Sequence, residues 1–249
     1  MTLKLYVDHV SHHCREVIIF CKLNGIDFEE VLVDLSKRQH LNPEYKEVNP
    51  IMQIPAIMDG KFKLSESHAI LRYLASAFPI ADHWYPADLY KRAKIESVLD
   101  WHRTNFPRGP AGFVSLSLLA PAVGRPLNPQ AAAKAEKLLI ASLAQIESVW
   151  LQKKGRFLLG SGQPSVADLS LACEIMQLEV LDDKVRERIL GPFKRVTKWL
   201  DDTKHVMAPH FEEVHSILYK VKKKRQKQTS PVGSSSTQSS RKRDLHSKM

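Results

Sequence analysis

The first third of the chain changes its hydrophobic period several times within short distances. Residues 3–7 alternate apolar and polar side chains, which is typical of a half-buried strand. The apolar segment at 16–21 is too long for another short strand and predicts a helix that ends at Asn24-Gly25. Residues 28–33 alternate again, so the pattern predicts a strand–helix–strand unit whose two strands are parallel.

An irregular stretch and a hairpin are predicted next. Residues 36–50 have no apolar period, although two Asn-Pro pairs enclose a short helical piece within them. Residues 54–58 and 62–64 read as two short strands on either side of Asp59-Gly60, a dipeptide typical of tight hairpin turns. The first third of the chain therefore predicts two parallel and two antiparallel strands.

The rest of the chain carries only helical periodicity. Ser65 or Ser67 is placed to cap a helix whose apolar side chains begin at residue 69. The pattern lapses between residues 78 and 86, and no strand signal follows. Ser165 and Asp168 have the spacing of a capping box. Further helices are predicted near 88–106, 110–120, 128–152, 165–180, 193–205 and 207–222.

The composition is that of a globular protein. The chain has 249 residues, 43% of them hydrophobic, enough for one large domain or two smaller ones. No apolar run approaches the roughly 18 residues that a membrane span needs, and the N-terminus lacks a signal-peptide apolar region, so we expect synthesis in the cytosol. Cys14, Cys21 and Cys173 lack metal-ligand spacing, and we expect them to be reduced thiols.

The net charge of +10 belongs mostly to one end of the chain. Residues 221–249 carry nine Lys or Arg and one acid, Asp244, a net charge of +8 that leaves +2 for residues 1–220. The nearly neutral body argues against nucleic-acid binding by the folded part. From Lys222 onward the chain is rich in Lys, Ser and Gln with few apolar residues, which predicts disorder.

Reactive side chains gather directly after the first predicted strand. A hydroxyl, two imidazoles, a thiol and a guanidinium follow one another there: Ser11, His12, His13, Cys14 and Arg15. The start of the following helix would favour an anion at this turn. From the pattern alone, Ser11 fits either a helix cap or a functional hydroxyl. We expect both imidazoles to stay neutral near pH 7, because a positive charge there opposes the helix dipole.

Several segments, in this order, resemble the soluble glutathione transferases, most closely the plant members of the theta class. They are the run at 11–15, the segments 49–56 and 64–70, the capping box, and Asp100-Trp101-His102. The resemblance covers residues 3 to about 220. It implies an α/β N-terminal thioredoxin-like domain with a four-stranded mixed sheet, followed by an all-α helical-bundle domain. We accordingly expect a first domain at 1–80, a linker at 81–87, a helical domain at 88–221 and a basic disordered tail at 222–249.

The resemblance implies a transferase that conjugates glutathione to electrophiles and reduces organic hydroperoxides, including those of lipids. Glutathione would be a co-substrate, with no permanently bound cofactor and no metal, and the protein would form a homodimer. Ser11 would stabilise the glutathione thiolate through a hydrogen bond, with help from the helix dipole. The other glutathione-binding residues that the resemblance implies are His12, His40, Leu41, Gln53, Ile54 through its backbone, Glu66 and Ser67.

The second substrate is expected in a hydrophobic pocket of the helical domain. The resemblance points to Trp101, Arg108 and Phe113, although Trp101 is also typical of core packing. Two departures from the family stand out. Many theta proteins have proline where this chain has His13, and related proteins often carry paired arginines where this chain has Pro107-Arg108.

Two other functions fit the same residues. Ser11 and Cys14 have the spacing of a thioredoxin-like Cys-x-x-Cys motif whose first cysteine is replaced, so Cys14 is a candidate for thiol transfer. We expect serine to hold the exposed position and Cys14 to face the core. The other alternative is a non-catalytic carrier of small ligands with a transferase fold, against which the retained Ser11 and Glu66-Ser67 argue.

Two segments of the tail resemble targeting signals. Residues 222–227 resemble a nuclear localisation cluster, or equally a helix end whose cations complement the helix dipole. Ser247-Lys248-Met249 resembles the peroxisomal Ser-Lys-Leu signal, with Met in place of Leu, and would engage the peroxisomal import receptor. We therefore expect the protein in peroxisomes, the nucleus or the cytosol.

Overall fold

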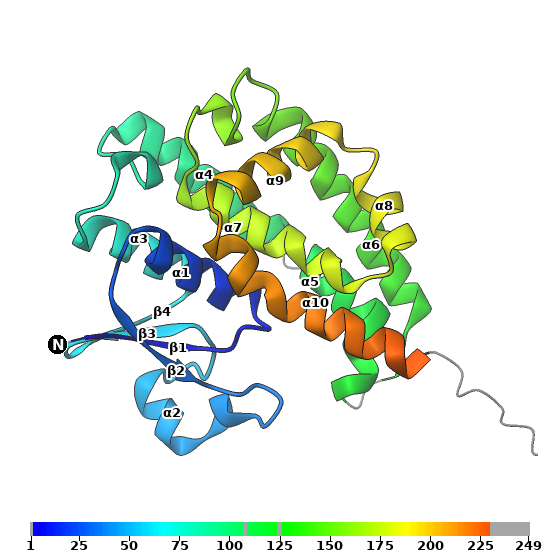
Figure 1. Ribbon diagram of the computed structural model, residues 1–249, viewed down its shortest axis with the longest axis horizontal. Coiled ribbons are helices and arrows are strands. Elements are labelled where there is room, and N and C mark those ends of the chain that lie inside the picture. Colours follow the sequence, from blue (N-terminus) through cyan, green and yellow to red (C-terminus); the bar gives the residue numbers. More distant parts are fainter. Residues whose placement is uncertain (1, 107–108, 124–125, 230–249) are drawn as a thin grey trace, which may run out of the picture.

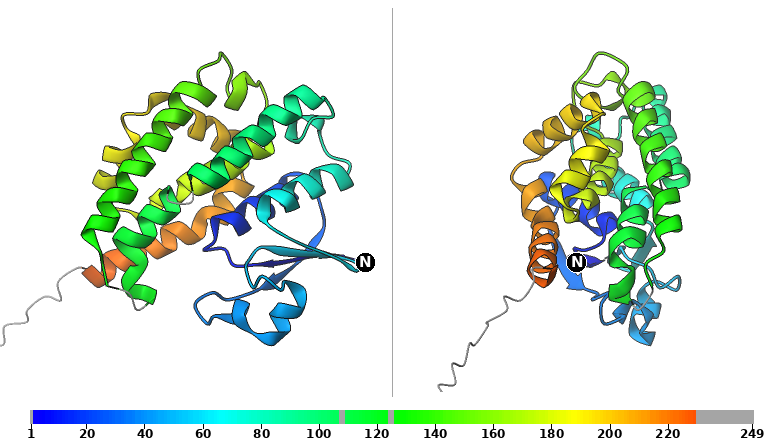
Figure 2. Two further views of the ribbon diagram at one scale, coloured as in Figure 1. Left: turned by 180° about the vertical axis from the view of Figure 1, so that it is seen from behind. Right: turned by 90° about the vertical axis from the view of Figure 1, so that its right-hand side faces the viewer.

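The computed structural model describes residues 2–106, 109–123 and 126–229. A small domain built on a β-sheet packs against a larger helical domain (Figure 1). The N-terminal end of β1 and the described end of α10 lie on opposite sides of the molecule in the front and rear views (Figures 1 and 2). Both domains contribute to one continuous hydrophobic core.

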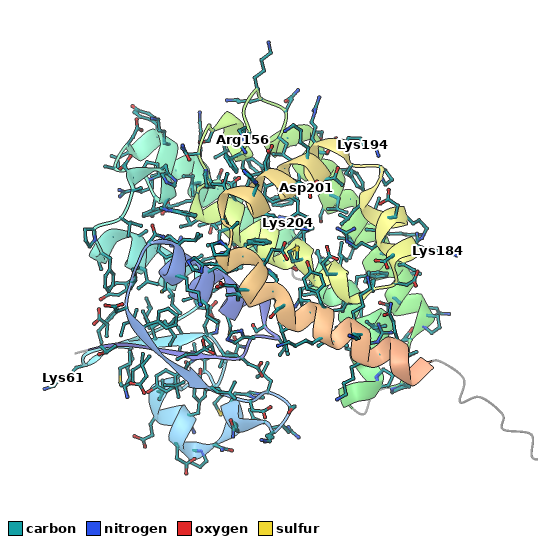
Figure 3. The ribbon with its side chains drawn as sticks, in the orientation of Figure 1. Lys61, Arg156, Lys184, Lys194, Asp201 and Lys204 are labelled. Atoms are coloured by element: carbon teal, nitrogen blue, oxygen red, sulfur yellow. The ribbon has the colours of Figure 1, made fainter. Side chains whose placement is uncertain are left out.

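Four strands form one mixed sheet in the order β2-β1-β3-β4. β1 (Leu3–Val7) pairs in parallel with β2 (Phe28–Leu32) and antiparallel with β3 (Ala56–Asp59). β3 pairs antiparallel with β4 (Phe62–Ser65), and Lys61 at the tip of this hairpin points away from the helical domain (Figure 3). This is the thioredoxin-like sheet that the sequence predicted, and the prediction of a helical second domain is also confirmed.

Helices cover both faces of the sheet (Figure 1). α1 (His12–Leu23) and α3 (Ser67–Ala77) lie on the face that meets the helical domain, where alternate residues of β1 join the main core. A 3₁₀ turn (Gln39–Leu41) and α2 (Pro43–Val48) lie on the other face. A separate small core beneath α2 contains Val33, Tyr45 and Ala56.

The helical domain contains seven of the α-helices in the described ranges. They are α4 (Leu89–Asn105), α5 (Pro110–Val114), α6 (Pro129–Gln145), α7 (Val166–Ile175), α8 (Asp183–Leu190), α9 (Lys194–Val206) and α10 (His210–Thr229). Shorter 3₁₀ or π turns lie at Asp82–Trp84, Ser115–Leu119, Ala120–Val123, Ile146–Trp150, Leu158–Gly160 and Met176–Val180.

α7 is the central helix of this domain, and all of its residues are buried. The predicted capping box is present at its start: Ser165 accepts a hydrogen bond from the helix backbone, and the Asp168 carboxylate accepts one from the Ser165 amide. The same carboxylate accepts hydrogen bonds from the Leu158 amide and the Trp199 indole, at 2.8 Å each. Asp168 therefore joins α7, the preceding loop and α9.

Three local predictions were wrong. α8 was not predicted, because five of its eight residues are charged and only Ile189 and Leu190 are buried. The chain does not leave helical structure at Lys222, since α10 continues to Thr229. Neither Ser65 nor Ser67 caps α3: the N-cap position belongs to Glu66, whose side chain makes no capping hydrogen bond.

In the described ranges, none of the helices combines the length and the apolar content that crossing a membrane requires. The predicted tail signal Ser247-Lys248-Met249 lies outside the described residues.

Candidate active site

The register of the sheet brings four separate segments of the chain to one edge. The parallel pairing of β1 with β2 places the residues that follow both strands at the same edge. Tyr6 of β1 lies opposite Ala56, the first residue of β3, and Ala56 lies opposite Ser65, the last residue of β4. The predicted glutathione-binding residues follow or precede these strand ends: Ser11, His40, Leu41, Gln53, Ile54, Glu66 and Ser67.

Ser11 is the N-cap residue of α1, but its side chain makes no capping hydrogen bond. Its backbone carbonyl accepts hydrogen bonds from the amides of Cys14 and Arg15, so the helix begins regularly. The first turn of α1 contains no acidic residue that would neutralise the helix dipole. These observations therefore favour a functional role for the Ser11 hydroxyl over a capping role.

Two side chains hold the loop that precedes Ser11. The Asp8 carboxylate accepts hydrogen bonds from the amides of Val10 and Leu35, which ties the loop to the segment after β2. The fully buried Arg15 guanidinium donates to the carbonyls of His9 and Val10. It also donates to the Cys173 carbonyl of α7 at 3.3 Å. Arg15 is therefore a positioning residue that fixes this loop against the helical domain.

Strained backbone conformations occur beside each of the other three segments. Within the described ranges, four residues other than glycine have positive φ angles, and three of them are Arg38, Met52 and Glu66. Arg38 is followed by the turn that carries His40 and Leu41, and Met52 precedes Gln53. Such conformations cost about 1–3 kcal/mol each and are concentrated at functional sites. The strain therefore supports the binding residues independently of the sequence motifs.

The Gln53–Ile54 segment is fixed from below. The Tyr45 hydroxyl and the Asn49 amide both donate to the Gln53 carbonyl, at 2.6 and 2.7 Å. The Gln53 carbonyl is thus already hydrogen-bonded within the protein. The Nδ1 atom of His40 is buried and has no hydrogen-bond partner among the described residues, which is uncommon for a buried polar atom.

Cys14 is unsuited to act as a nucleophile. Its thiol is fully buried. Burial raises the pKa of the Cys14 thiol to about 12, against the opposing hydrogen bonds with the Asp8 backbone and the Ser11 side chain. The prediction that Cys14 faces the core is confirmed, and the thiol-transfer alternative loses its support.

A polar cavity of about 350 Å³ opens beside this turn, between α1, α3, α4, α5 and α7. Four histidines contribute to its wall: His12, His13, His68 and His102. The buried carboxylate of Glu174 lies 2.6 Å from Nε2 of His102 and 3.6 Å from Nε2 of His12. Burial, followed by the positive neighbours His13 and Arg15, lowers the pKa of His12 well below its usual value, so this imidazole is neutral as predicted.

His13 behaves in the opposite way. Desolvation favours the neutral ring, but the Glu16 carboxylate 3.6 Å away, together with the Glu174 and Glu66 carboxylates, raises the pKa of His13. The prediction of a neutral His13 ring considered only the helix dipole, whereas the buried carboxylate one turn further along α1 opposes the dipole and favours the imidazolium. Nδ1 of His13 lies 3.6 Å from Glu16 and 3.2 Å from the Ser67 hydroxyl.

The predicted second-substrate residues separate in the structure. Phe113 lines a cavity of about 270 Å³ together with residues from the turn at Ser115–Leu119, the turn at Met176–Val180, α8 and α10. Trp101 instead is partly buried against the main core, packs against Phe106 and Trp150, and donates to Gln145 of α6. Arg108 and Pro107 lie outside the described residues.

Two family models match the chain. The N-terminal domain of glutathione S-transferases matches residues 5–82, and their C-terminal domain matches residues 129–202. The chain belongs to the glutathione S-transferase family. Arabidopsis thaliana glutathione S-transferase T1 is 61% identical over 228 residues, which are 91% of this chain and 93% of that protein. Glutathione S-transferase T3 of the same plant is 57% identical over 92% of this chain, but the chain spans only 39% of its length.

Solved structures agree with this assignment. A human glutathione transferase theta-2 in complex with glutathione and an unknown ligand superposes with a TM-score of 0.83, at 29% identity, over 92% of each chain. Together with the plant relatives, this places the chain in the theta class, as the sequence predicted.

Within this transferase site, sequence reasoning missed the residues that act from other helices. His68, His102 and Glu174 lie around the reactive turn. No spacing rule links them, because α3, α4 and α7 contribute them separately. Among the described residues, no group of three or more His, Cys, Asp or Glu side chains is arranged to hold a metal ion.

Proposed function

We propose that this protein transfers the thiolate of glutathione to electrophilic carbon and reduces organic hydroperoxides. The observation that carries the proposal is the convergence of Ser11, residues 40–41, residues 53–54 and residues 66–67 at one edge of the sheet. Membership of the glutathione S-transferase family supports the transferase activity itself. Glutathione is then the co-substrate.

The central chemical task is to lower the pKa of the glutathione thiol. A thiol with a pKa of about 8.5 is only about 3% ionised at pH 7, and a decrease of about two units, worth roughly 2.7 kcal/mol, makes it mostly thiolate. The Ser11 hydroxyl donates one hydrogen bond to the sulfur, and the N-terminus of α1 adds a favourable dipole. Arg15 holds the loop that presents Ser11.

The peptide would lie along the edge of the sheet. Glu66 and Ser67 hold the amine and the carboxylate of the γ-glutamyl group, Gln53 and the Ile54 backbone hold the middle, and His40 with Leu41 hold the glycyl end. The unpartnered Nδ1 of His40 and the strained φ of 70° at Glu66 support this assignment.

The electrophile would occupy the cavity beside Phe113. The turn Met176–Val180 links that cavity to the reactive loop: Gln177 donates to the Val10 carbonyl, and Val180 lines the cavity. A 3₁₀ turn rises about 2 Å per residue, so the two contacts are about 6 Å apart along its axis. Half of the wall is apolar, including Leu118, Leu181 and Val185, which suits the hydrophobic part of a substrate. The other half is polar or charged: Ser117, Asp182, Lys222, Arg225 and Gln226.

Both reactions use the same thiolate. In conjugation, the sulfur forms a bond to carbon and the leaving group departs with its electron pair. In peroxide reduction, the sulfur attacks the outer peroxide oxygen, the O–O bond breaks and an alcohol leaves after protonation. A second glutathione then condenses with the oxidised sulfur to give the disulfide and water.

Purified protein should bind immobilised glutathione and turn over at least one of three substrates: a halogenated aromatic, an aralkyl halide and a lipid hydroperoxide. Initial rates with each substrate measure whether transfer or reduction dominates. Retention on glutathione without turnover of any substrate would favour the carrier alternative. A folded protein that does not bind would contradict the proposed function altogether.

We also propose that two copies associate into a homodimer. Large apolar side chains on β4 and at the start of α4 are exposed in the single chain, including Leu89 at 73%, Tyr90 at 86% and Phe62 at 46%. A second copy is the occupant that the family resemblance supports. Light scattering of the purified protein measures this association directly.

For the location in the cell, we propose import into peroxisomes through Ser247-Lys248-Met249. A fluorescent protein attached at the N-terminus leaves this tripeptide free and should appear in peroxisomes, whereas attachment after Met249 should not. Diffuse fluorescence from both fusions would contradict the proposal. The alternative signal at residues 222–227 also contributes contacts to the fold. Lys222 pairs with Asp183, and Arg225 donates to the Val180 carbonyl.

A further inference from the structure

One imidazole of the polar cavity is placed to meet a ligand. His13 lies on the cavity wall beside Glu66 and Ser67, and its side chain keeps 45% of its exposure. Its Nδ1 atom lies 3.2 Å from the Ser67 hydroxyl. The other ring nitrogen, Nε2, lies on the opposite edge of the ring, and no described residue forms a hydrogen bond with it.

The carboxylate beneath His13 needs a cation. Glu16 is fully buried, and neither of its carboxylate oxygens has a hydrogen-bond partner among the described residues. Burial would raise its pKa, but the neighbouring His13 and His68 imidazoles and Ser170 lower the pKa of Glu16 to about 2. A buried carboxylate that stays ionised requires a positive partner, because its desolvation is otherwise uncompensated. His13 is the closest such group, at 3.6 Å.

Other charged groups face the same space from every element around it. From α1 there is His12, with Glu16 fully buried behind the wall, from the start of α3 Glu66, and from α7 Glu174. The remaining titratable or charged side chains on the wall are His68, Arg72, Asp100, His102 and Arg103. The wall thus carries both signs of charge, which suits a group that bears an ammonium and a carboxylate side by side.

We infer that His13 is the cation that binds the α-carboxylate of the γ-glutamyl group of glutathione, next to the Ser67 hydroxyl. The inference rests on the proposed function. Among the cationic side chains on the wall, His13 is the one that contacts Ser67, and the buried Glu16 carboxylate, 3.6 Å from its ring, favours the imidazolium. The ligand therefore meets an imidazolium whose charge is supported from the protein interior.

A dependence of affinity on pH follows. The raised pKa of His13 means that the imidazolium persists above the ordinary histidine pKa of about 6.5 and is lost as the pH rises further. Affinity for glutathione is then highest below the pKa of His13 and falls as the pH rises through it. S-methylglutathione isolates this effect, because its sulfur does not ionise.

The test measures calorimetric binding of S-methylglutathione and of an analogue in which 4-aminobutyrate replaces the γ-glutamyl residue, so that only the α-carboxylate is missing. His13→Gln should weaken S-methylglutathione about five- to tenfold at pH 6 and leave the affinity for the analogue unchanged. Wild-type protein should lose its pH dependence when the analogue replaces S-methylglutathione. That second measurement needs no variant and stands even if a substitution disturbs folding.

The chain offers a matched control in His210→Gln. His210 also pairs with a glutamate three residues later, Glu213, at 3.0 Å and with 32% exposure, but it lies at the start of α10. This variant should bind both ligands like the wild type. Glu16→Gln should keep the affinity at pH 6 closer to wild type than His13→Gln does, and should move the midpoint of the pH dependence to lower pH.

Two results would overturn the inference. Equal weakening of both ligands by His13→Gln would show that His13 only shapes the wall, and an unchanged affinity for S-methylglutathione would remove its role. Failure of wild-type protein to bind S-methylglutathione is a different result, because it contradicts the proposed function and the inference together.

Discussion

Replacement of Ser11 by alanine should lower kcat/KM for conjugation about 100-fold near pH 7, the usual cost of losing one oriented donor to a developing anion. The Ser11 hydroxyl is not used as a helix cap, so its loss should not unfold α1. The defect should shrink as the pH approaches the thiol's own pKa of about 8.5, because the thiolate then forms without help. The rate of conjugation and the ultraviolet absorbance of bound thiolate, both measured across pH, test this result.

The matched control for this prediction is Cys14→Ser. Cys14 lies one helical turn after Ser11, and its thiol is buried and protonated. This variant should keep conjugation close to the wild-type rate. Full activity in Ser11→Ala together with lost activity in Cys14→Ser would assign the chemistry to the thiol and reverse the proposed mechanism.

The substitution with the largest expected effect on stability is Asp168→Asn. One oxygen of this buried carboxylate accepts from the Leu158 amide and the Trp199 indole, and the other accepts from the amide and the hydroxyl of Ser165. Asparagine replaces one accepting oxygen by an NH₂ group, which itself donates. The two hydrogen-bond donors that faced that oxygen then lose their acceptor. The free energy of unfolding should therefore fall by about 3 kcal/mol, with a decrease in Tm of about 10 °C.

Asp202→Asn is the control for this stability measurement. The Asp202 carboxylate also accepts charged hydrogen bonds, from Arg156 and Lys198, but these partners are half-exposed to well-exposed surface cations. Such pairs contribute about 1 kcal/mol or less. Denaturation in urea should show a clearly larger loss of unfolding free energy for Asp168→Asn than for Asp202→Asn. An equal loss in both variants would show that the buried hydrogen bonds of Asp168 have no special weight in the stability of the domain.

The elements that sequence predicted best were those with a local cause. The alternation in residues 3–7, the stop at Asn24-Gly25 and the capping box at Ser165 each act within one element and its immediate neighbours. α8 was not predicted because it spans only eight residues, five of them charged, so the apolar pattern is too short to stand out. The extension of α10 escaped because its Lys-rich composition resembles a disordered tail, whereas Lys222 and Arg225 are held by contacts with distant residues.

The protonation of His13 also depends on both a local effect and a tertiary effect. The helix dipole, a local quantity, predicted a neutral ring. Glu16 stands three residues later in the sequence, but its influence depends on its complete burial. The burial of a side chain depends on which residues pack over it. The sequence therefore showed that Glu16 is near His13, but not how strongly its carboxylate would act on the His13 ring.

By itself, the sequence determined the order of strands and helices and the positions of Ser11, Gln53, Glu66 and Ser67 relative to the strand ends. Strand connections alone then place these residues at one edge of the sheet. Only the tertiary structure decided that Arg15 holds the reactive loop, that Glu16 is fully buried beside His13, and that the histidine cavity forms between helices of both domains. The physical reason is that hydrogen-bond distance, desolvation and charge coupling depend on packing between residues far apart in the chain.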